Sequence, residues 1–228
     1  MSDAVRVKIC GIRRLPDALV AAEAGADAIG LNFWRPGRRY VAPEVARQIA
    51  RALPPFVCKV GVFVDEEPDT VRAIADLVGL DALQLHGTET PEVCAGFDLP
   101  VIKSIKVRGP ESLEGLARYR VAGFLLDTHV PGAAAPGGSG QTFDWALAIR
   151  ARDAGPIVLS GGLTPDNVEQ AIRLARPYAV DVASGVETNG EKDPGKIRAF
   201  VARVQAWNSA REAAARPEAP RETGEVRR

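Results

Sequence analysis

The chain has 228 residues, 46% of them hydrophobic, with 29 basic and 29 acidic side chains and no net charge at neutral pH. This length suits one domain with a sizeable core, and the balanced charge argues against a global basic field for nucleic acid or acidic membranes. The first residues lack the apolar stretch of a signal peptide, and no apolar run approaches about 20 residues. Three cysteines, Cys10, Cys58 and Cys94, make an odd count without close pairing. We therefore expect a cytoplasmic protein with no membrane or nucleic-acid partner.

Short apolar, β-branched runs recur along the chain and predict eight strands. Several are apolar on both faces, as strands of a parallel sheet are when helices cover the outside. The expected strands are Val5–Ile9, Ala28–Phe33, Val57–Val64, Ala82–Leu85, Val101–Val107, Gly123–Leu126, Ile157–Leu159 and Ala179–Ala183.

Segments with helical periodicity lie between these strands. Prolines stand where several first turns should begin, which suits proline because its missing N–H needs no partner there. The expected helices are Leu15–Ala24, Pro43–Leu53, Pro68–Val78, Phe143–Ala154, Pro165–Ala175 and Pro194–Trp207.

This alternation predicts a protein of the α/β class, a single (β/α)8 barrel over residues 1–207. Strand starts are spaced by about 25 residues, close to one unit of a barrel whose typical length is about 250. An open doubly wound sheet is the alternative, but it would more often show about five or six strands and one Gly-rich nucleotide turn.

Two segments interrupt the alternation of predicted strands and helices. Thr128–Gln141 is rich in Gly, Ala and Pro, and a long loop inside a compact barrel is usually a lid or a binding loop. Residues 208–228 carry no sustained apolar stripe, so we expect this tail to be disordered or a frayed helical extension.

Two glycine-containing turns follow the seventh and eighth predicted strands. They contain Gly161 and Gly162 in the first turn, and Ser184 and Gly185 in the second. Glycines let backbone N–H groups approach an anion closely, and barrels often bind phosphate at these two loops. The alternative is two tight turns, but the pair together favours a phosphate site.

Cys10 and Asp127 end apolar strands at the edge where barrel enzymes carry their chemistry. A free cysteine often packs as a small hydrophobe, yet a thiol here would face the barrel mouth. Lys8 on the same strand face would raise its thiolate fraction if the ammonium group approaches the sulfur. Asp127 suits either a turn cap or, if enclosed, a neutral acid. Residues alone leave these two roles of Asp127 open.

Arg39 lies in a basic loop after the second strand. It suits a solvated surface position or a two-point contact with a ligand carboxylate. His86 and His129 are conceivable metal ligands together with Cys10 or Asp127. However, no His-x-His, HExxH or CxxC spacing is present, so we expect no metal.

Ten short stretches follow one another in a fixed order between Val7 and about Val204. Each is weak alone, but together they resemble the phosphoribosylanthranilate isomerase family. They are KICGI (Lys8–Ile12), RRYV (Arg38–Val41), VGVFVD (Val60–Asp65), LQLHG (Leu83–Gly87), VIKSIKV (Val101–Val107), LLDT (Leu125–Thr128), GGSGQTFDW (Gly137–Trp145), LSGGLTPDNV (Leu159–Val168), VDVASGVE (Val180–Glu187) and KDPGKIRAF (Lys192–Phe200).

This resemblance implies an Amadori rearrangement of a phosphoribosyl-anthranilate, with no metal or organic cofactor, by a monomer or homodimer. It implies that Cys10 is the general base, that Asp127 is the general acid, and that Arg39 holds the anthranilate carboxylate. The expected substrate-binding residues are Lys8, Arg39, His86, Gly161, Gly162, Asp181, Ser184 and Gly185.

The chain departs from the family pattern at three positions. Gly37 replaces a common serine, Arg38 replaces what is often a proline, and Ser139 replaces the threonine of a Gly-Thr-Gly loop. The rival interpretations are another phosphosugar isomerase or epimerase, an indole-glycerol-phosphate synthase, or a catalytically silent phosphate-ligand sensor on the same barrel. The presence of both Cys10 and Asp127 argues against the sensor.

Overall fold

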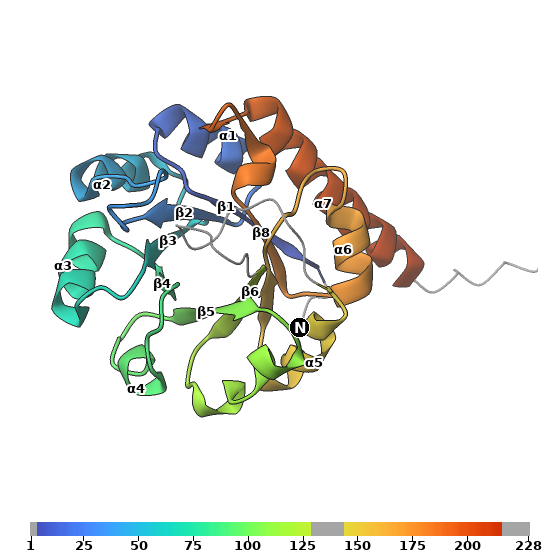
Figure 1. The fold of residues 1–228 in the computed structure, drawn as a ribbon. Helices are drawn as coiled ribbons and strands as arrows, with labels where there is room; N and C mark the ends of the chain where they lie inside the picture. Colours follow the sequence, from blue (N-terminus) through green and yellow to red (C-terminus); the bar gives the residue numbers. More distant parts are fainter. Residues whose placement is uncertain (1–3, 129–143, 216–228) are drawn as a thin grey trace, which may run out of the picture.

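The computed structural model describes residues 4–128 and 144–215. Eight parallel strands close into a barrel in chain order, and helices surround it (Figure 1). The predicted (β/α)8 barrel is therefore confirmed. Its strands are β1 (Arg6–Cys10), β2 (Ala28–Asn32), β3 (Cys58–Phe63), β4 (Ala82–Leu85), β5 (Val101–Val107), β6 (Gly123–Thr128), β7 (Ile157–Leu159) and β8 (Ala179–Val182).

The helices that cover the barrel mostly begin where proline predicts a first turn. Gly25 and Gly79 end the first and third helices in the left-handed conformation, with φ of 96° and 73°, which glycine adopts without a steric cost. The helices are α1 (Leu15–Ala24), α2 (Pro43–Ala52), α3 (Pro68–Val78), α4 (Pro91–Cys94), α5 (Leu147–Ala151), α6 (Val168–Ala175) and α7 (Pro194–Ala215).

The barrel interior is divided into an apolar layer and a polar layer. Ile102, Leu125, Val158 and Ala179 form a small apolar cluster of their own, separate from the large core between the strands and the helices. Because side chains alternate along a strand, residues two positions further on point to the same side. Asp127, Ser160 and Asp181 occupy those positions beyond Leu125, Val158 and Ala179, so the polar layer lies toward the carboxyl ends of the strands.

Helix α6 begins three residues later than Pro165 predicts. The backbone N–H of Thr164 donates to Asn167 Oδ1, and Asn167 Nδ2 donates to the carbonyl oxygen of Gly162. These side-chain hydrogen bonds hold the segment before Val168 in a turn, so the first turn of regular helix is delayed.

The C-terminal helix runs beyond the expected barrel boundary at residue 207. It continues to Ala215, and the Asn208 side chain both donates to the carbonyl oxygen of Val5 and accepts from its N–H at 2.9 Å. The helical start of the predicted tail thus packs on the first strand. The remaining tail, and the predicted loop after Thr128, lie outside the described residues.

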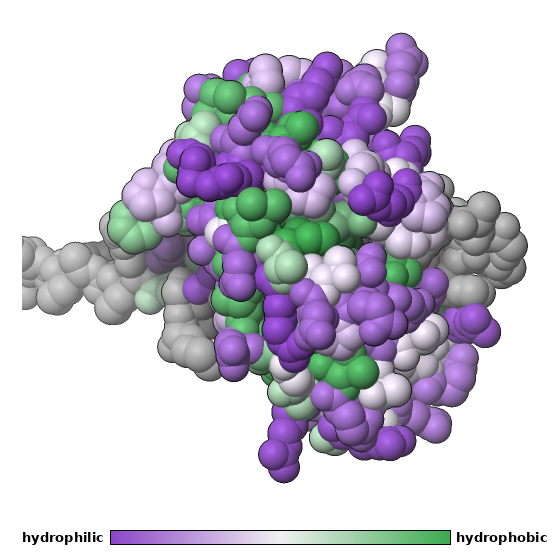
Figure 2. Space-filling model, turned by 90° about the vertical axis from the view of Figure 1, so that its left-hand side faces the viewer, coloured by the Kyte–Doolittle hydropathy of each residue, from purple (hydrophilic) through white to green (hydrophobic). Residues whose placement is uncertain are grey.

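The surface alternates between polar and apolar patches. On the side shown in Figure 2, which is the left-hand side of Figure 1, hydrophilic side chains predominate and apolar ones are scattered among them. Among the residues described, no helix combines the length and apolarity that crossing a membrane requires.

Candidate active site

A small cavity of about 50 Å³ lies at the carboxyl ends of the strands. It brings together five of the predicted site residues, which come from five different strands or the loops that follow them: Cys10, Arg39, His86, Asp127 and Asp181. The rest of its lining is Asn32, Trp34, Val62, Val64, Gln84, Ser160 and Ala183.

A buried ion pair joins the first and last strands beside Cys10. Lys8 Nζ lies 2.6 Å from Asp181 Oδ1, and both side chains are about 95% buried. Ser160 Oγ donates to the other oxygen of Asp181 at 3.1 Å. Burial alone would lower the pKa of Lys8, but Asp181 and Cys10 outweigh it and raise that pKa above its usual range. Lys8 is therefore a permanent cation next to the thiol.

The thiol of Cys10 is nevertheless harder to ionise than a free cysteine. Burial raises its pKa, Lys8 opposes that shift, Asp181 adds to it, and Lys192 opposes it; the net pKa is raised. The sequence correctly indicated that Lys8 lies near Cys10 and favours the thiolate. The net pKa is still raised because the desolvation cost, which the sequence does not show, is the larger effect.

Asp127 is buried within β6 and points into the cavity, with 3% of its surface exposed. Its Oδ1 accepts the backbone N–H of Thr128 at 2.9 Å. Its Oδ2 lies 3.4 Å from Nε2 of His86. The carboxyl is therefore enclosed, which is the condition that the acid role requires, and it also accepts the N–H of the next residue, as a turn cap does.

Arg39 is held by a carboxylate that sequence reasoning missed. Its Nε and Nη2 donate to Oε1 and Oε2 of Glu187 at 2.6 and 2.9 Å. Lys192 donates to the same carboxylate at 2.8 Å. Glu187 therefore occupies one edge of the guanidinium and leaves the Nη1–Nη2 edge for a ligand. Glu187 stands in ASGVE, two residues after Gly185, so that motif was the available signal.

Burial and charge act against each other in this cluster. Burial would raise the pKa of Glu187, but Arg39 and Lys192 outweigh it and lower that pKa. Burial lowers the pKa of Lys192 below its usual range, although Glu187 opposes the shift. The carboxylate is thus firmly ionised and orients Arg39.

The two predicted phosphate-binding turns lie against each other but do not line the small cavity. Gly161 and Gly162 both have positive φ, 85° and 66°. A side chain on Gly185 would collide with the carbonyl oxygen of Leu163 in the other turn. In the described part of the chain, the backbone N–H groups of Gly161 and Gly162 donate no hydrogen bond, and they remain available to an anion.

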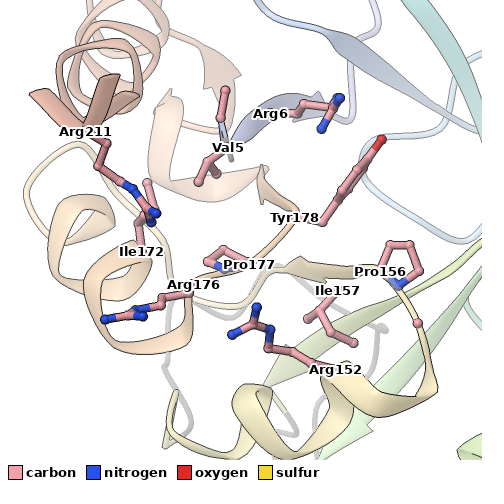
Figure 3. Close-up of a pocket in the computed structure, with 12 residues that line it drawn as sticks. Val5, Arg6, Arg152, Pro156, Ile157, Ile172, Arg176, Pro177, Tyr178 and Arg211 are labelled. Atoms are coloured by element: carbon pink, nitrogen blue, oxygen red, sulfur yellow. The ribbon is translucent and has the colours of Figure 1, made fainter. Parts of the chain in front are cut away.

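A larger cavity lies at the opposite end of the barrel, where β1, β7 and β8 begin. Its volume is about 710 Å³, and its lining includes Tyr178 and the arginines Arg6, Arg152, Arg176 and Arg211 (Figure 3). The lining contains no cysteine, histidine or carboxylate. The smaller cavity combines a thiol, an imidazole and two carboxyl groups, which are the side chains that most often transfer protons, and it is therefore the catalytic candidate.

Metal-ligand geometry is not present among the residues described. No group of three or more His, Cys, Asp and Glu side chains there is placed to hold an ion.

The side chain of Gln84 contacts Nδ1 of His86 at 2.8 Å. Sequence reasoning also missed Gln84, although it stands two residues before His86 in LQLHG and hence on the same face of its strand.

Comparison with known proteins shows the family to which the sequence is similar. The sequence profile of the family described as N-(5'phosphoribosyl)anthranilate (PRA) isomerase matches residues 7–203. An N-(5'-phosphoribosyl)anthranilate isomerase of Geobacter sp. (strain M21) is 53% identical over 201 residues, 88% of this chain and 98% of that protein.

Solved structures agree with this match. The phosphoribosyl anthranilate isomerase of Thermotoga maritima superposes with a TM-score of 0.83 at 48% identity, covering 89% of this chain and 99% of that one. A second solved isomerase, in complex with reduced 1-(o-carboxyphenylamino)-1-deoxyribulose 5-phosphate, gives a TM-score of 0.79 at 45% identity, with the same coverage.

Proposed function

This chain belongs to the N-(5′-phosphoribosyl)anthranilate isomerase family, whose members are aldose–ketose isomerases of tryptophan biosynthesis, and we propose that Cys10 is its general base and Asp127 its general acid. The observation that carries this assignment is their shared cavity: a thiol from β1 and a carboxyl from β6 line one small space together with Arg39. General acid–base catalysis needs such groups within reach of one substrate.

The first chemical step is assigned to Asp127. In its protonated form it gives a proton to the ring oxygen of the aminoaldose, the bond between C1′ and that oxygen breaks, and an iminium ion forms. Enclosure in β6 excludes the water that would otherwise compete for this proton. The lone pair of the substrate nitrogen forms the new bond to C1′ as the ring oxygen leaves, and the iminium nitrogen then serves as the electron sink of the second step, so neither step requires pyridoxal phosphate or a metal.

The second step is assigned to Cys10. The iminium ion makes the proton at C2′ acidic, and the thiolate removes it to give an enolamine, which tautomerises to the ketose. The permanent cation of Lys8 beside the sulfur supports the thiolate form. Because the net pKa of Cys10 is raised, only a minor fraction of the free protein carries the thiolate at neutral pH, and that thiolate is a correspondingly stronger base.

Binding is assigned to groups around this pair. The free edge of Arg39 suits the anthranilate carboxylate, and the Gly161–Gly162 and Ser184–Gly185 turns suit the phosphate. Lys8, Asp181 and His86 remain our predictions for contacts to the sugar. We also infer a cytoplasmic location and, as the assembly, a monomer or a homodimer.

Turnover assays of two variants test this assignment. Loss of the substrate's anthranilate fluorescence would be followed for the wild type, Cys10→Ala and Asp127→Asn. We expect kcat to fall by about 10² to 10⁴ in each variant, with an unchanged far-ultraviolet circular dichroism spectrum. Near-wild-type kcat in either variant would remove that residue from its role.

A further inference from the structure

Three polar side chains form a row across the upper barrel interior, from β4 to β6. The Gln84 amide nitrogen, Nε2, lies 2.8 Å from Nδ1 of His86. The second ring nitrogen of His86, also named Nε2, lies 3.4 Å from Oδ2 of Asp127. All three residues are at least nine-tenths buried, and all three line the catalytic cavity.

The chemistry of an amide fixes the protonation of this histidine. An amide NH₂ group donates hydrogen bonds and cannot accept them, so Nδ1 of His86 must be the acceptor. A neutral imidazole that accepts at Nδ1 carries its hydrogen on Nε2. Within residues 4–128 and 144–215 that ring nitrogen has no hydrogen-bond partner, and Oδ2 of Asp127, 3.4 Å away, is a carboxylate oxygen within reach of a small adjustment.

We propose that Gln84 is a positioning residue for the general acid, because it holds His86 as the neutral tautomer whose Nε2–H faces Asp127. As Asp127 gives its proton to the substrate it becomes a carboxylate, and the Nε2–H group of His86 then donates a hydrogen bond to it. The proton of His86 itself stays on the ring. This inference rests on the role of Asp127 proposed above.

Neutrality of His86 is essential to this arrangement. An imidazolium would place a positive charge beside Asp127 and keep it ionised, which would remove the proton that the acid must supply. Protonation would also put an N–H at Nδ1 directly opposite the N–H of Gln84, two donors with no acceptor between them. Gln84 therefore opposes the charged ring. The cations Lys8 and Arg39 also disfavour a positive charge on the His86 ring. The carboxyl groups of Asp127 and Asp181 favour that charge, as does a thiolate at Cys10.

Nitrogen-15 spectroscopy tests the tautomer directly. The chain contains two histidines, His86 and His129, so protein labelled with ¹⁵N-histidine gives a simple spectrum, and His129→Asn assigns it. At neutral pH we expect His86 to show a protonated Nε2 and an unprotonated Nδ1. A protonated Nδ1 would overturn the proposal in either of two forms. One is the other neutral tautomer, which would donate to the amide oxygen of Gln84, and the other is the imidazolium.

Two substitutions of Gln84 test its effect on catalysis. Gln84→Glu supplies an acceptor to Nδ1 and favours the imidazolium, so both ring nitrogens of His86 should become protonated and kcat should fall by about tenfold or more, with KM changed less. Gln84→Met removes the donor without adding charge and should lower kcat by a smaller factor, with both tautomers present. Gln205→Glu, the same change on the exposed face of α7, should leave kcat, KM and the His86 signals unchanged.

The outcomes separate this proposal from the assignment of the acid. An unchanged kcat in folded Gln84→Glu, or a reduced kcat with His86 still neutral, would overturn the role of Gln84. If Gln84→Glu does not fold, the wild-type spectrum and Gln84→Met still decide. Retained activity in Asp127→Asn would instead overturn the proposed acid, and the histidine spectrum would still report whether Gln84 fixes the tautomer.

Discussion

The sulfur of Cys10 lies 2.7 Å from the point that a Cβ atom on Gly30 would occupy. The two residues are register partners on β1 and β2, and the same Cβ position is 3.2 Å from Nζ of Lys8. The absence of a side chain at residue 30 is therefore what leaves room for the thiol and the ammonium group.

We expect Gly30→Ala to impair catalysis while leaving the barrel folded. The added methyl would push the sulfur from its position, and kcat should fall by about 10- to 100-fold, since small misplacements of a reacting group are costly. Overpacking should reduce the free energy of unfolding by about 1–3 kcal/mol. Gly96→Ala, where the nearest atom is 3.4 Å away, is the matched control. Equal kcat in both variants would show that the thiol tolerates displacement.

Alkylation of Cys10 should become faster with pH, with a midpoint above that of a free cysteine in the same buffer. The pKa of this thiol is raised, so the protonated form persists at neutral pH and the reactive thiolate grows as pH rises. Lys8→Met removes a cation that lowers the pKa and should move the midpoint further up. Iodoacetamide labelling followed by peptide mass spectrometry separates Cys10 from Cys94, whose pKa burial raises to about 11. A midpoint for Cys10 at or below that of free cysteine would contradict the raised pKa of this thiol.

Glu187→Gln should destabilise the protein and weaken substrate binding together. It leaves Arg39 and the buried Lys192 without their carboxylate, and loss of one partner of a buried ion pair costs about 3–5 kcal/mol. Urea unfolding measures that loss, and KM should rise as Arg39 loses its orientation. Adding Lys192→Met should recover part of the stability but not the KM. Additive losses of stability in the double variant would show that the two side chains are not coupled.

Prolonged dialysis against EDTA should leave the reaction rate unchanged. In the proposed mechanism the protons move through Cys10 and Asp127, and the substrate nitrogen accepts the electrons, so no step depends on a Lewis acid. The fluorescence assay before and after dialysis measures this. A loss of rate that a divalent ion restores would require a different mechanism.

Several strand positions could be predicted closely from the sequence because short runs rich in apolar and β-branched residues mark them. β4, β5 and β7 were predicted to the residue. The start of α6 was not, because Pro165 signals a first turn whereas the Thr164–Asn167 hydrogen bonds that delay the helix depend on local geometry.

The placement of Cys10, Asp127 and Arg39 at one edge of the barrel could be predicted because each of them ends a strand or follows one. Their supporting contacts could not. Glu187 lies 148 residues from Arg39 along the chain, and nothing in the local sequence around either residue indicates that the two side chains are in contact. The raised pKa of Cys10 likewise depends on burial, which a strand pattern alone does not measure.

The ion pair between Lys8 and Asp181 spans the seam where the first strand meets the last, and the two residues are also register partners. During synthesis on the ribosome the eighth strand emerges long after the first, so an unfinished chain holds Lys8 without its carboxylate partner. Recovery of turnover during refolding would therefore report the closing of the barrel itself, later than any signal from helix formation.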